Sequence, residues 1–232
     1  MNALLFDAPE VKSIPVEGES AAYPIHRIFC VGRNYAAHAA EMNVEVDREA
    51  PFYFSKAALH AQASGTTIPY PPGTANYHYE MELVIAIGKP VFKEPVETAS
   101  TAIYAFGCGL DMTRRDKQLD ARAKGRPWDV GKDVEQSAVF APLVKSDAAP
   151  GIGPQRIHLE VNGETKQDAH LSDLIWNLDE IVSDLSHYYH LVPGDVIMTG
   201  TPAGVGAVGP GDVITGGIDG MGSIELTIGP AE

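Results

Sequence analysis

The sequence predicts a β-rich α+β domain, sandwich-like or roll-like, with two or three short helices. Short runs rich in Val, Ile and Leu recur along the chain and are typical of strands. The 23 glycines and 17 prolines are spread over the whole length, which indicates many turns between these strands. At 232 residues, 44% of them hydrophobic, the chain is long enough to bury one sizeable core.

The first part of the chain predicts an arm followed by a strand and a helix. Residues 1–24 are expected to form an N-terminal arm or hairpin, and 25–232 a single catalytic domain. The apolar run of 26–32 predicts the first core strand. Asn34 is a favourable N-cap residue for a helix over 35–42.

The middle of the chain predicts further strands and a polar helix. A short strand is expected over 52–54, and apolar strands over 80–88 and 103–111. The polar composition of the segment that follows predicts a helix over 113–124.

The last third predicts a hairpin, a helix and short strands. Asn-Gly at 162–163 favours a type I′ turn between strands over 158–161 and 164–167. Apolar residues at helical spacing predict an amphipathic helix over 173–190. The remaining expected strands are 196–199, 212–215 and 223–228.

Composition excludes several classes of function. The chain carries 31 Asp and Glu against 17 Lys and Arg, a net charge of −14, which argues against binding to nucleic acid or to anionic membranes. Its two cysteines, Cys30 and Cys108, are too few for a disulfide scaffold. The N-terminus lacks signal-peptide features, and the longest apolar runs are too short to span a membrane. We therefore expect a cytoplasmic protein.

Three carboxylates suggest a metal site. Glu80 and Glu82 lie two apart on a predicted strand, so both side chains point to the same face, and Asp111 ends another strand. An oxygen-rich set without cysteine suits Mg²⁺ or Mn²⁺ better than zinc. The alternative is a solvated strand face. His78 shares the parity of Glu80 and is expected to be a neighbouring or core histidine.

A second pair suggests proton transfer. His38 and Glu41 are three apart on the predicted helix and therefore share one face. A histidine oriented by a carboxylate is a suitable general base for activating water. The alternative is an ordinary exposed helix with two polar residues.

Other polar residues are candidates for binding an anionic substrate. Arginine binds carboxylates bidentately, and lysine provides a point charge for a carboxylate or an enolate. The glycine-rich turn at 200–206 lacks the pattern of a nucleotide-binding loop and is expected to present backbone N–H groups and the hydroxyl of Thr201 to a ligand. The charged and amide candidates are Lys56, Arg115, Gln118 and Lys132.

Taken together, six segments from about residue 25 to 229 resemble the fumarylacetoacetate hydrolase family. None is specific alone, but they occur in the order typical of the family. They are GRNYAAHAAEM (32–42), HYEMELVIAIG (78–88), GLDMTRRDKQ (109–118), GRPWDVGK (125–132), VNGETKQ (161–167) and PGDVIMTGTPAGVG (193–206).

The resemblance implies a mixed β-sandwich roll, a homodimer and specific roles for the site residues. Glu80, Glu82 and Asp111 match the ligands of a divalent metal, expected to be Mg²⁺ with Mn²⁺ or Ca²⁺ as alternatives. His38 and Glu41 match a pair that activates water. Lys132 matches a position in the substrate pocket with a catalytic role. The positions that match a substrate-binding role are Arg33, Arg115, Gln118 and Thr201.

Within the family, the segments DMTRRDKQ, GRPWD and DLIWN are similar to bacterial fumarylpyruvate hydrolases of gentisate-type aromatic degradation. The resemblance therefore implies hydrolysis of a carbon–carbon bond in a 2,4-diketo acid, fumarylpyruvate giving fumarate and pyruvate. Decarboxylation of oxaloacetate, hydrolysis of other acylpyruvates, isomerisation of unsaturated keto acids and non-catalytic binding of keto acids are the alternatives. The stretch after Lys132 departs from the family pattern, so the pocket wall there is expected to differ.

Overall fold

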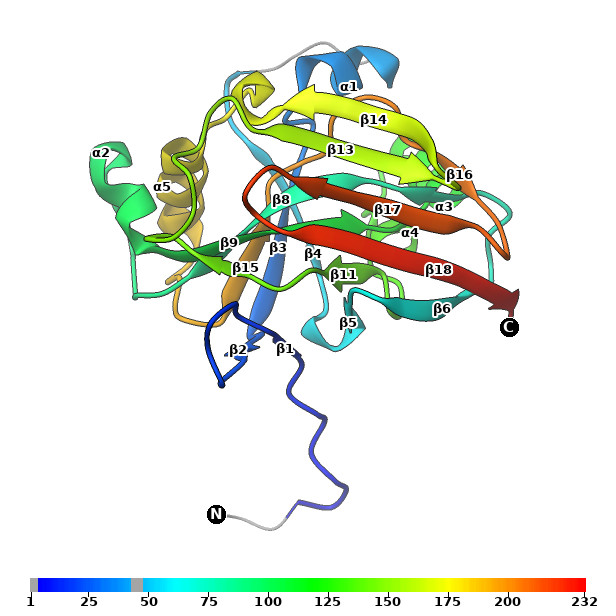
Figure 1. The fold of residues 1–232 in the computed structure, drawn as a ribbon, viewed down its shortest axis with the longest axis horizontal. Helices are drawn as coiled ribbons and strands as arrows, with labels where there is room; N and C mark the ends of the chain where they lie inside the picture. Colours follow the sequence, from blue (N-terminus) through cyan, green and yellow to red (C-terminus); the bar gives the residue numbers. More distant parts are fainter. Residues whose placement is uncertain (1–3, 43–47) are drawn as a thin grey trace.

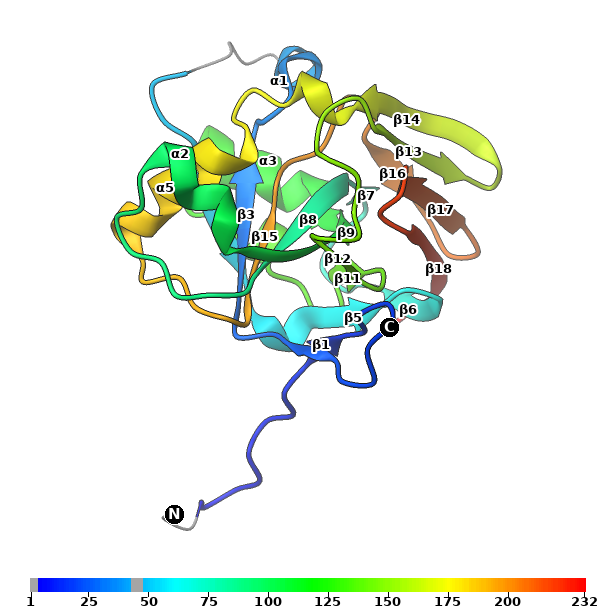
Figure 2. The same ribbon diagram turned by 60° about the vertical axis from the view of Figure 1, so that its left-hand side comes forward.

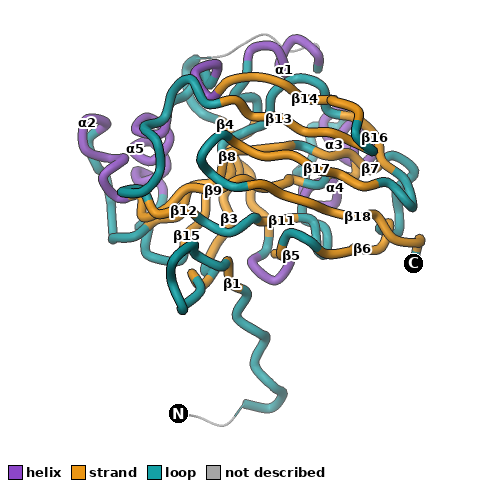
Figure 3. Tube along the Cα trace, viewed as in Figure 1, coloured by secondary structure: helices purple, strands orange, loops and turns teal. Residues whose placement is uncertain are grey.

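The computed structural model describes residues 4–42 and 48–232, and strands predominate in it (Figures 1 and 3). The largest sheet has eight strands and is mixed: β15 pairs in parallel with β3 and antiparallel with β8. Its order is β4 (Phe52–Lys56), β3 (Arg27–Gly32), β15 (Asp195–Met198), β8 (Met81–Ile87), β9 (Ile103–Asp111), β11 (Ala138–Phe140) and β5 (Ala61–Ala63), with β12 (Val144–Lys145) also paired with β9.

A five-stranded sheet covers one face of the large sheet (Figure 1). Its order is β14 (Glu164–His170), β13 (Arg156–Val161), β17 (Val213–Ile218), β18 (Ser223–Ala231) and β6 (Thr66–Tyr70). Two smaller sheets complete the described strands: β10 (Thr113–Arg114), β7 (Tyr77–Tyr79) and β16 (Gly206–Val208) form one, and β1 (Ser13–Ile14) with β2 (Tyr23–Pro24) forms the other.

The described helices are short and lie around the sheets (Figure 2). None of them is long and apolar enough to cross a membrane. The α-helices are α1 (Ala36–Glu41), α2 (Val96–Ala99), α3 (Arg115–Ala123), α4 (Asp129–Lys132) and α5 (Leu178–Tyr188), and the 3₁₀ helices are η1 (Ala58–His60), η2 (Ser100–Ala102) and η3 (Leu171–Asp173).

Strand β8 is buried along its whole length and divides the core into two parts. Leu83 and Ile85 belong to the cluster that contains the inward side chains of the five-stranded sheet. Val84 and Ala86 belong to a second cluster on the opposite face, which the β1–β2 hairpin helps to cover. This alternation follows from the period of two in a strand, and it confirms the predicted sandwich-like, β-rich fold.

Several predicted elements are confirmed. Strand β9 begins and ends where predicted, and the strand expected at 26–32 is β3. The predicted hairpin is β13–β14, in which Asn162 and Gly163 have φ of 53° and 78°, the left-handed conformation that a type I′ turn requires.

Three predicted helix starts differ from the structure. Asn34 is not the N-cap of α1, because Tyr35 occupies that position and has no side-chain capping bond. The helix expected from residue 113 begins at Arg115, since Thr113 and Arg114 pair with β7. The helix expected from residue 173 begins at Leu178, where the side chains of Asn177 and Glu180 cap each other's backbone N–H.

Candidate active site

The three predicted carboxylates converge on one buried point. Glu80 and Asp111 are neighbours across β8 and β9, and the backbone N–H of Asp111 donates to the carbonyl of Glu80 at 2.9 Å. Glu82 lies two residues along, opposite Gly109. One carboxylate oxygen from each of the three lies within 4.8 Å of the others, and all three residues are buried. This confirms that they form a cluster and not a solvated strand face.

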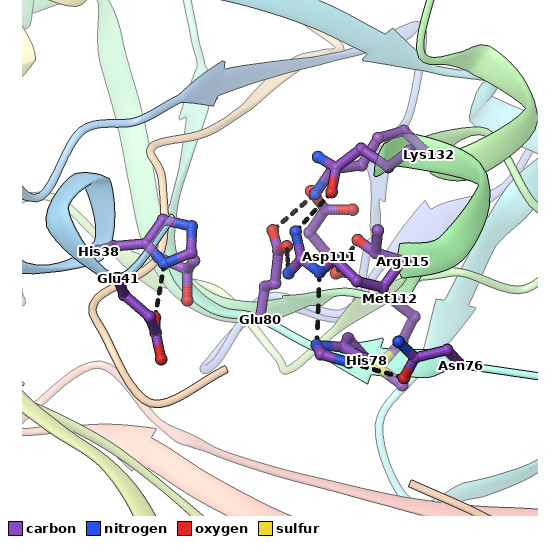
Figure 4. A network of polar contacts seen from close by, with 12 residues as sticks. His38, Glu41, Asn76, His78, Glu80, Asp111, Met112, Arg115 and Lys132 are labelled. Atoms are coloured by element: carbon purple, nitrogen blue, oxygen red, sulfur yellow. Dashed lines mark hydrogen bonds and ion pairs between the residues drawn. The ribbon is translucent and has the colours of Figure 1, made fainter. Parts of the chain in front are cut away.

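Glu80, Glu82 and Asp111 are called the acidic triad below, and three buried cations contact two of its members. Figure 4 shows Arg115 and Lys132 beside Glu80 and Asp111. Lys132 Nζ lies 2.6 Å from Glu80 Oε2 and 2.6 Å from Asp111 Oδ2. Lys56 Nζ lies 2.9 Å from the other oxygen of Asp111. Arg115 Nη2 donates to Glu80 Oε1 at 2.5 Å. Charges of both signs are thus matched inside the protein, as burial of ions requires.

Glycine at position 131 places Lys132. Helix α4 lies so close to α3 that a Cβ on Gly131 would be 2.7 Å from the backbone nitrogen of Gln118. Only a residue without a side chain permits this approach. Lys132 is therefore held at the end of α4 with its ammonium group between two carboxylates.

The two glutamates of the triad differ in acidity. Burial alone would raise the pKa of Glu80, but Lys132 and Arg115 outweigh it and bring that pKa below the ordinary value. Burial raises the pKa of Glu82 well above the ordinary value, and the charges of Asp111 and Glu80 raise it further. Glu82 accepts a hydrogen bond from the backbone N–H of Gly200 at 2.8 Å. The Glu82 side of the triad is therefore where a further positive charge would be most stabilising.

The donor set fits a hard divalent cation. The three residues offer only carboxylate oxygens, the ligands that Mg²⁺, Mn²⁺ and Ca²⁺ prefer, and they belong to rigid strands or strand ends. The like charges of Glu80, Glu82 and Asp111 would be relieved by a cation placed between them.

His38 and Glu41, the pair for which proton transfer is predicted, contact each other on α1. His38 Nδ1 lies 3.1 Å from Glu41 Oε2, and Glu41 also accepts from the backbone N–H of Gly204 at 3.2 Å. Gly204 has φ of 97°, and a Cβ there would lie 2.0 Å from the carbonyl oxygen of Lys166, so this turn requires glycine. His38 is buried and lines the same pocket as Glu80 and Glu82. Figure 4 shows His38 on the side of Glu80 that is opposite to Arg115 and Lys132.

The glycine-rich turn is anchored by residues that the sequence did not reveal. Gln167 on β14 is fully buried, and its Nε2 donates to Thr201 Oγ1 and to the carbonyl of Pro202, both at 2.8 Å. The side chain of Asn34 donates to the carbonyl of Thr199 at 2.8 Å. Both contacts join residues far apart in sequence, so no local pattern signals them.

One pocket, with an empty volume of about 490 Å³, connects these groups. Predicted residues line it together with residues that were not predicted from the sequence. The predicted ones are Arg33, His38, Glu80, Glu82, Arg115, Gln118, Lys132 and Thr201, and the additional ones include Met42, Phe54, Leu119, Arg122 and Trp128.

Some predicted residues do not line the pocket but contact residues that do. Asp111 Oδ2 lies 2.6 Å from Lys132 Nζ, and Glu41 Oε2 lies 3.1 Å from His38 Nδ1. His78 lies 3.4 Å from Arg115 Nε, and its pKa is lowered to about 4 by burial and by the charge of Arg115. The neutral ring of His78 therefore supports Arg115 from behind, as expected of a neighbouring histidine.

Comparisons with known proteins found relatives that match most of the chain. The model of the fumarylacetoacetate (FAA) hydrolase C-terminal family matches residues 27–229. A fumarylpyruvate hydrolase of Ralstonia sp is 54% identical over 189 residues, which span 82% of this chain and 98% of that protein. The mitochondrial oxaloacetate tautomerase FAHD1 of Homo sapiens is 36% identical over 201 residues, 87% of this chain and 90% of that protein. The crystal structure of fumarylpyruvate hydrolase from Pseudomonas aeruginosa with Mn²⁺ and pyruvate has a TM-score of 0.94 and 43% identity, covering 98% of this chain and all of that one.

Proposed function

The chain belongs to the fumarylacetoacetate hydrolase family, and on this premise we propose that it hydrolyses a carbon–carbon bond in 2,4-diketo acids. The substrate is fumarylpyruvate, and the products are fumarate and pyruvate, as in gentisate-type aromatic degradation. One observation carries the proposal: a buried acidic triad and a His–Glu pair face each other across one pocket. The 54% identity to a fumarylpyruvate hydrolase supports this substrate over other acylpyruvates.

A divalent metal, Mg²⁺ in our proposal with Mn²⁺ or Ca²⁺ as alternatives, would be held by Glu80, Glu82 and Asp111. When bound, it would supply Lewis-acid stabilisation of the negative charge that develops on the pyruvate half of the substrate. The oxygen-only donor set and the raised pKa of Glu82 support the presence of such a cation.

His38 is the general base in this proposal. Its ring accepts a proton from water, and the water oxygen forms a bond to the carbonyl carbon of the fumaryl half. Glu41, 3.1 Å from Nδ1, orients the ring and stabilises the imidazolium that results. Burial of His38 in the pocket wall brings its free nitrogen to the substrate side.

The remaining polar residues bind the substrate and its developing charge. Lys132 and Gln118 stabilise the oxyanion formed by addition of water. The bond between the fumaryl carbonyl carbon and the neighbouring methylene carbon then breaks, and its electron pair stays with the pyruvate half, which takes up a proton. Arg115 holds Gln118 in place, since its Nη1 donates to Gln118 Oε1 at 2.5 Å. Thr201, anchored by Gln167, contacts the bound acid through its hydroxyl.

We also propose that the protein is a cytoplasmic homodimer. The extended segment before β1 supports self-association, because Leu5 and Phe6 in it are 94% and 85% exposed. Light scattering of the purified protein during size-exclusion chromatography tests this: twice the chain mass of 24.8 kDa is expected, and a monomeric mass would contradict it.

The loss of fumarylpyruvate absorbance tests the proposed reaction. The purified protein is assayed with Mg²⁺ and with Mn²⁺, with and without EDTA, beside acetylpyruvate and oxaloacetate. Rapid, EDTA-sensitive loss of fumarylpyruvate with stoichiometric release of pyruvate is expected. Persistence of fumarylpyruvate while oxaloacetate is decarboxylated or tautomerised would overturn the proposed substrate.

A further inference from the structure

Helix α3 contributes polar side chains to the pocket from three positions along its length. Arg115, Gln118 and Arg122 are spaced three and four residues apart, so they lie on one face of the helix, and all three line the pocket. Arg115, at the inner end, is buried and bound to Glu80. Arg122, at the outer end, is half-buried, and its Nη1 donates to the backbone carbonyl of Met42 at 3.2 Å.

Glu80 and Asp111 of the triad have cationic partners, whereas no carboxylate in the described part of the chain pairs with Arg122. Glu80 and Asp111 have Arg115, Lys132 and Lys56 as ion-pair partners. No carboxylate among residues 4–42 and 48–232 forms an ion pair with Arg122. Among the described residues, this half-buried guanidinium donates to one neutral carbonyl and retains donors for an anionic ligand.

Part of the pocket wall is apolar. Phe54, Leu119 and Trp128 line it, and the rings of Phe54 and Trp128 lie 6.0 Å apart. Such a wall suits a planar, unsaturated carbon chain with a charged group at each end.

The length of α3 fits such a ligand. The separation of seven positions between Arg115 and Arg122 corresponds to a rise of about 10 Å along the helix. The terminal carboxyl carbons of an extended seven-carbon diacid lie about 7–8 Å apart, from ordinary carbon–carbon bond lengths. A ligand of this length with one carboxylate at the triad end extends its second carboxylate towards Arg122, at the other end of the same helix face.

We propose that Arg122 binds the distal carboxylate of the substrate and thereby selects acylpyruvates whose acyl group carries a carboxylate over those with a neutral acyl group. This inference rests on the proposed function, since the reaction defines which end of the ligand is distal. Arg122 is a specificity-determining residue and takes no part in bond cleavage.

Kinetics on paired substrates test the proposal. Arg122→Gln is compared with wild type on fumarylpyruvate and on acetylpyruvate, which lacks the second carboxylate. Loss of a charge-assisted contact is expected to lower kcat/KM for fumarylpyruvate about 10- to 100-fold and to leave acetylpyruvate within about twofold. Arg122→Lys should recover part of the loss. Arg126→Gln is the matched control, because Arg126 is exposed just beyond the same helix and does not line the pocket.

Equal losses on both substrates, or no loss on either, would overturn the role of Arg122. Calorimetric binding of fumarate, compared with crotonate, gives a readout independent of turnover. If wild type binds fumarate in preference to crotonate and Arg122→Gln abolishes this preference, the distal carboxylate site is supported. This holds even if the protein does not hydrolyse fumarylpyruvate, in which case only the proposed reaction is refuted. If fumarate and crotonate bind wild type equally, the distal carboxylate site is refuted.

Discussion

Replacing Lys132 by methionine tests whether this ammonium group holds the acidic triad together. Methionine retains most of the aliphatic stem but removes the charge that lies 2.6 Å from both Glu80 and Asp111. Lys132 is only 2% exposed, so water cannot replace the lost cation without a change in packing. The two carboxylates are then left with Arg115 and Lys56 alone.

The structure sets the size of the expected loss. Removing one partner of a buried ion pair costs about 3–5 kcal/mol. A carboxyl with an ordinary pKa can instead take up a proton, at a cost of about 4 kcal/mol at pH 7, which limits the penalty. A loss of about 3–4 kcal/mol corresponds to a Tm lowered by about 6–16 °C for a chain of this size.

The loss should depend on pH. Without Lys132, burial raises the folded-state pKa of a triad carboxyl above its unfolded value, so the folded state binds more protons. Stability of Lys132→Met relative to wild type therefore falls as pH rises through that pKa. We expect a large difference in Tm at pH 8 and a smaller one at pH 5.

Calorimetry of both proteins in EDTA measures these differences. Lys124→Met is the control, because Lys124 forms a half-exposed ion pair with Asp120 and its loss should barely change Tm. A Lys132→Met protein that melts with wild type at both pH values would refute the assigned role of Lys132 as the buried counter-ion.

Three further outcomes follow from the site. Glu82→Gln should abolish the rise in Tm that Mn²⁺ produces in wild type, and a retained rise would show that the metal is held elsewhere. His38→Ala should lower kcat at least about 100-fold while leaving the Mn²⁺-induced rise in Tm intact, and loss of that rise would make His38 a ligand. Gly131→Ala should lower Tm and activity together, because its Cβ would lie 2.7 Å from the Gln118 backbone nitrogen, and unchanged values of both would contradict the close approach that places Lys132.

The sequence predicted those elements whose signals are local. The run from Ile103 to Asp111 and the turn at Asn162-Gly163 were predicted because apolar composition and turn chemistry suffice to define them. Asn34 was assigned to the wrong role, since its side chain could cap a helix but bonds instead to Thr199 and Trp176, distant in sequence. A prediction from local sequence cannot decide whether such a side chain forms a hydrogen bond within its own helix or with a residue distant in sequence.

The difference between local and long-range signals also explains which site residues are predictable from the sequence. Glu80 and Glu82 are identifiable because their spacing of two, directly before and within β8, is a local feature, and Asp111 because it ends a strand. Gln167 and Arg122 gave no such signal. Their importance depends on β14 reaching the glycine-rich turn and on the direction of α3 within the pocket, and both are properties of the assembled fold.

The insertion of β15 between β3 and β8 has a consequence for biosynthesis. Arg27 on β3 pairs with Asp195, so the centre of the large sheet closes only when most of the chain has left the ribosome. Nearly every proposed catalytic and metal-binding group precedes residue 133, yet a nascent chain of that length lacks the strand that separates β3 from β8. Such long-range parallel pairing slows folding and raises contact order. The active centre is therefore completed late, and a truncated product would carry the acidic residues without the means to organise them.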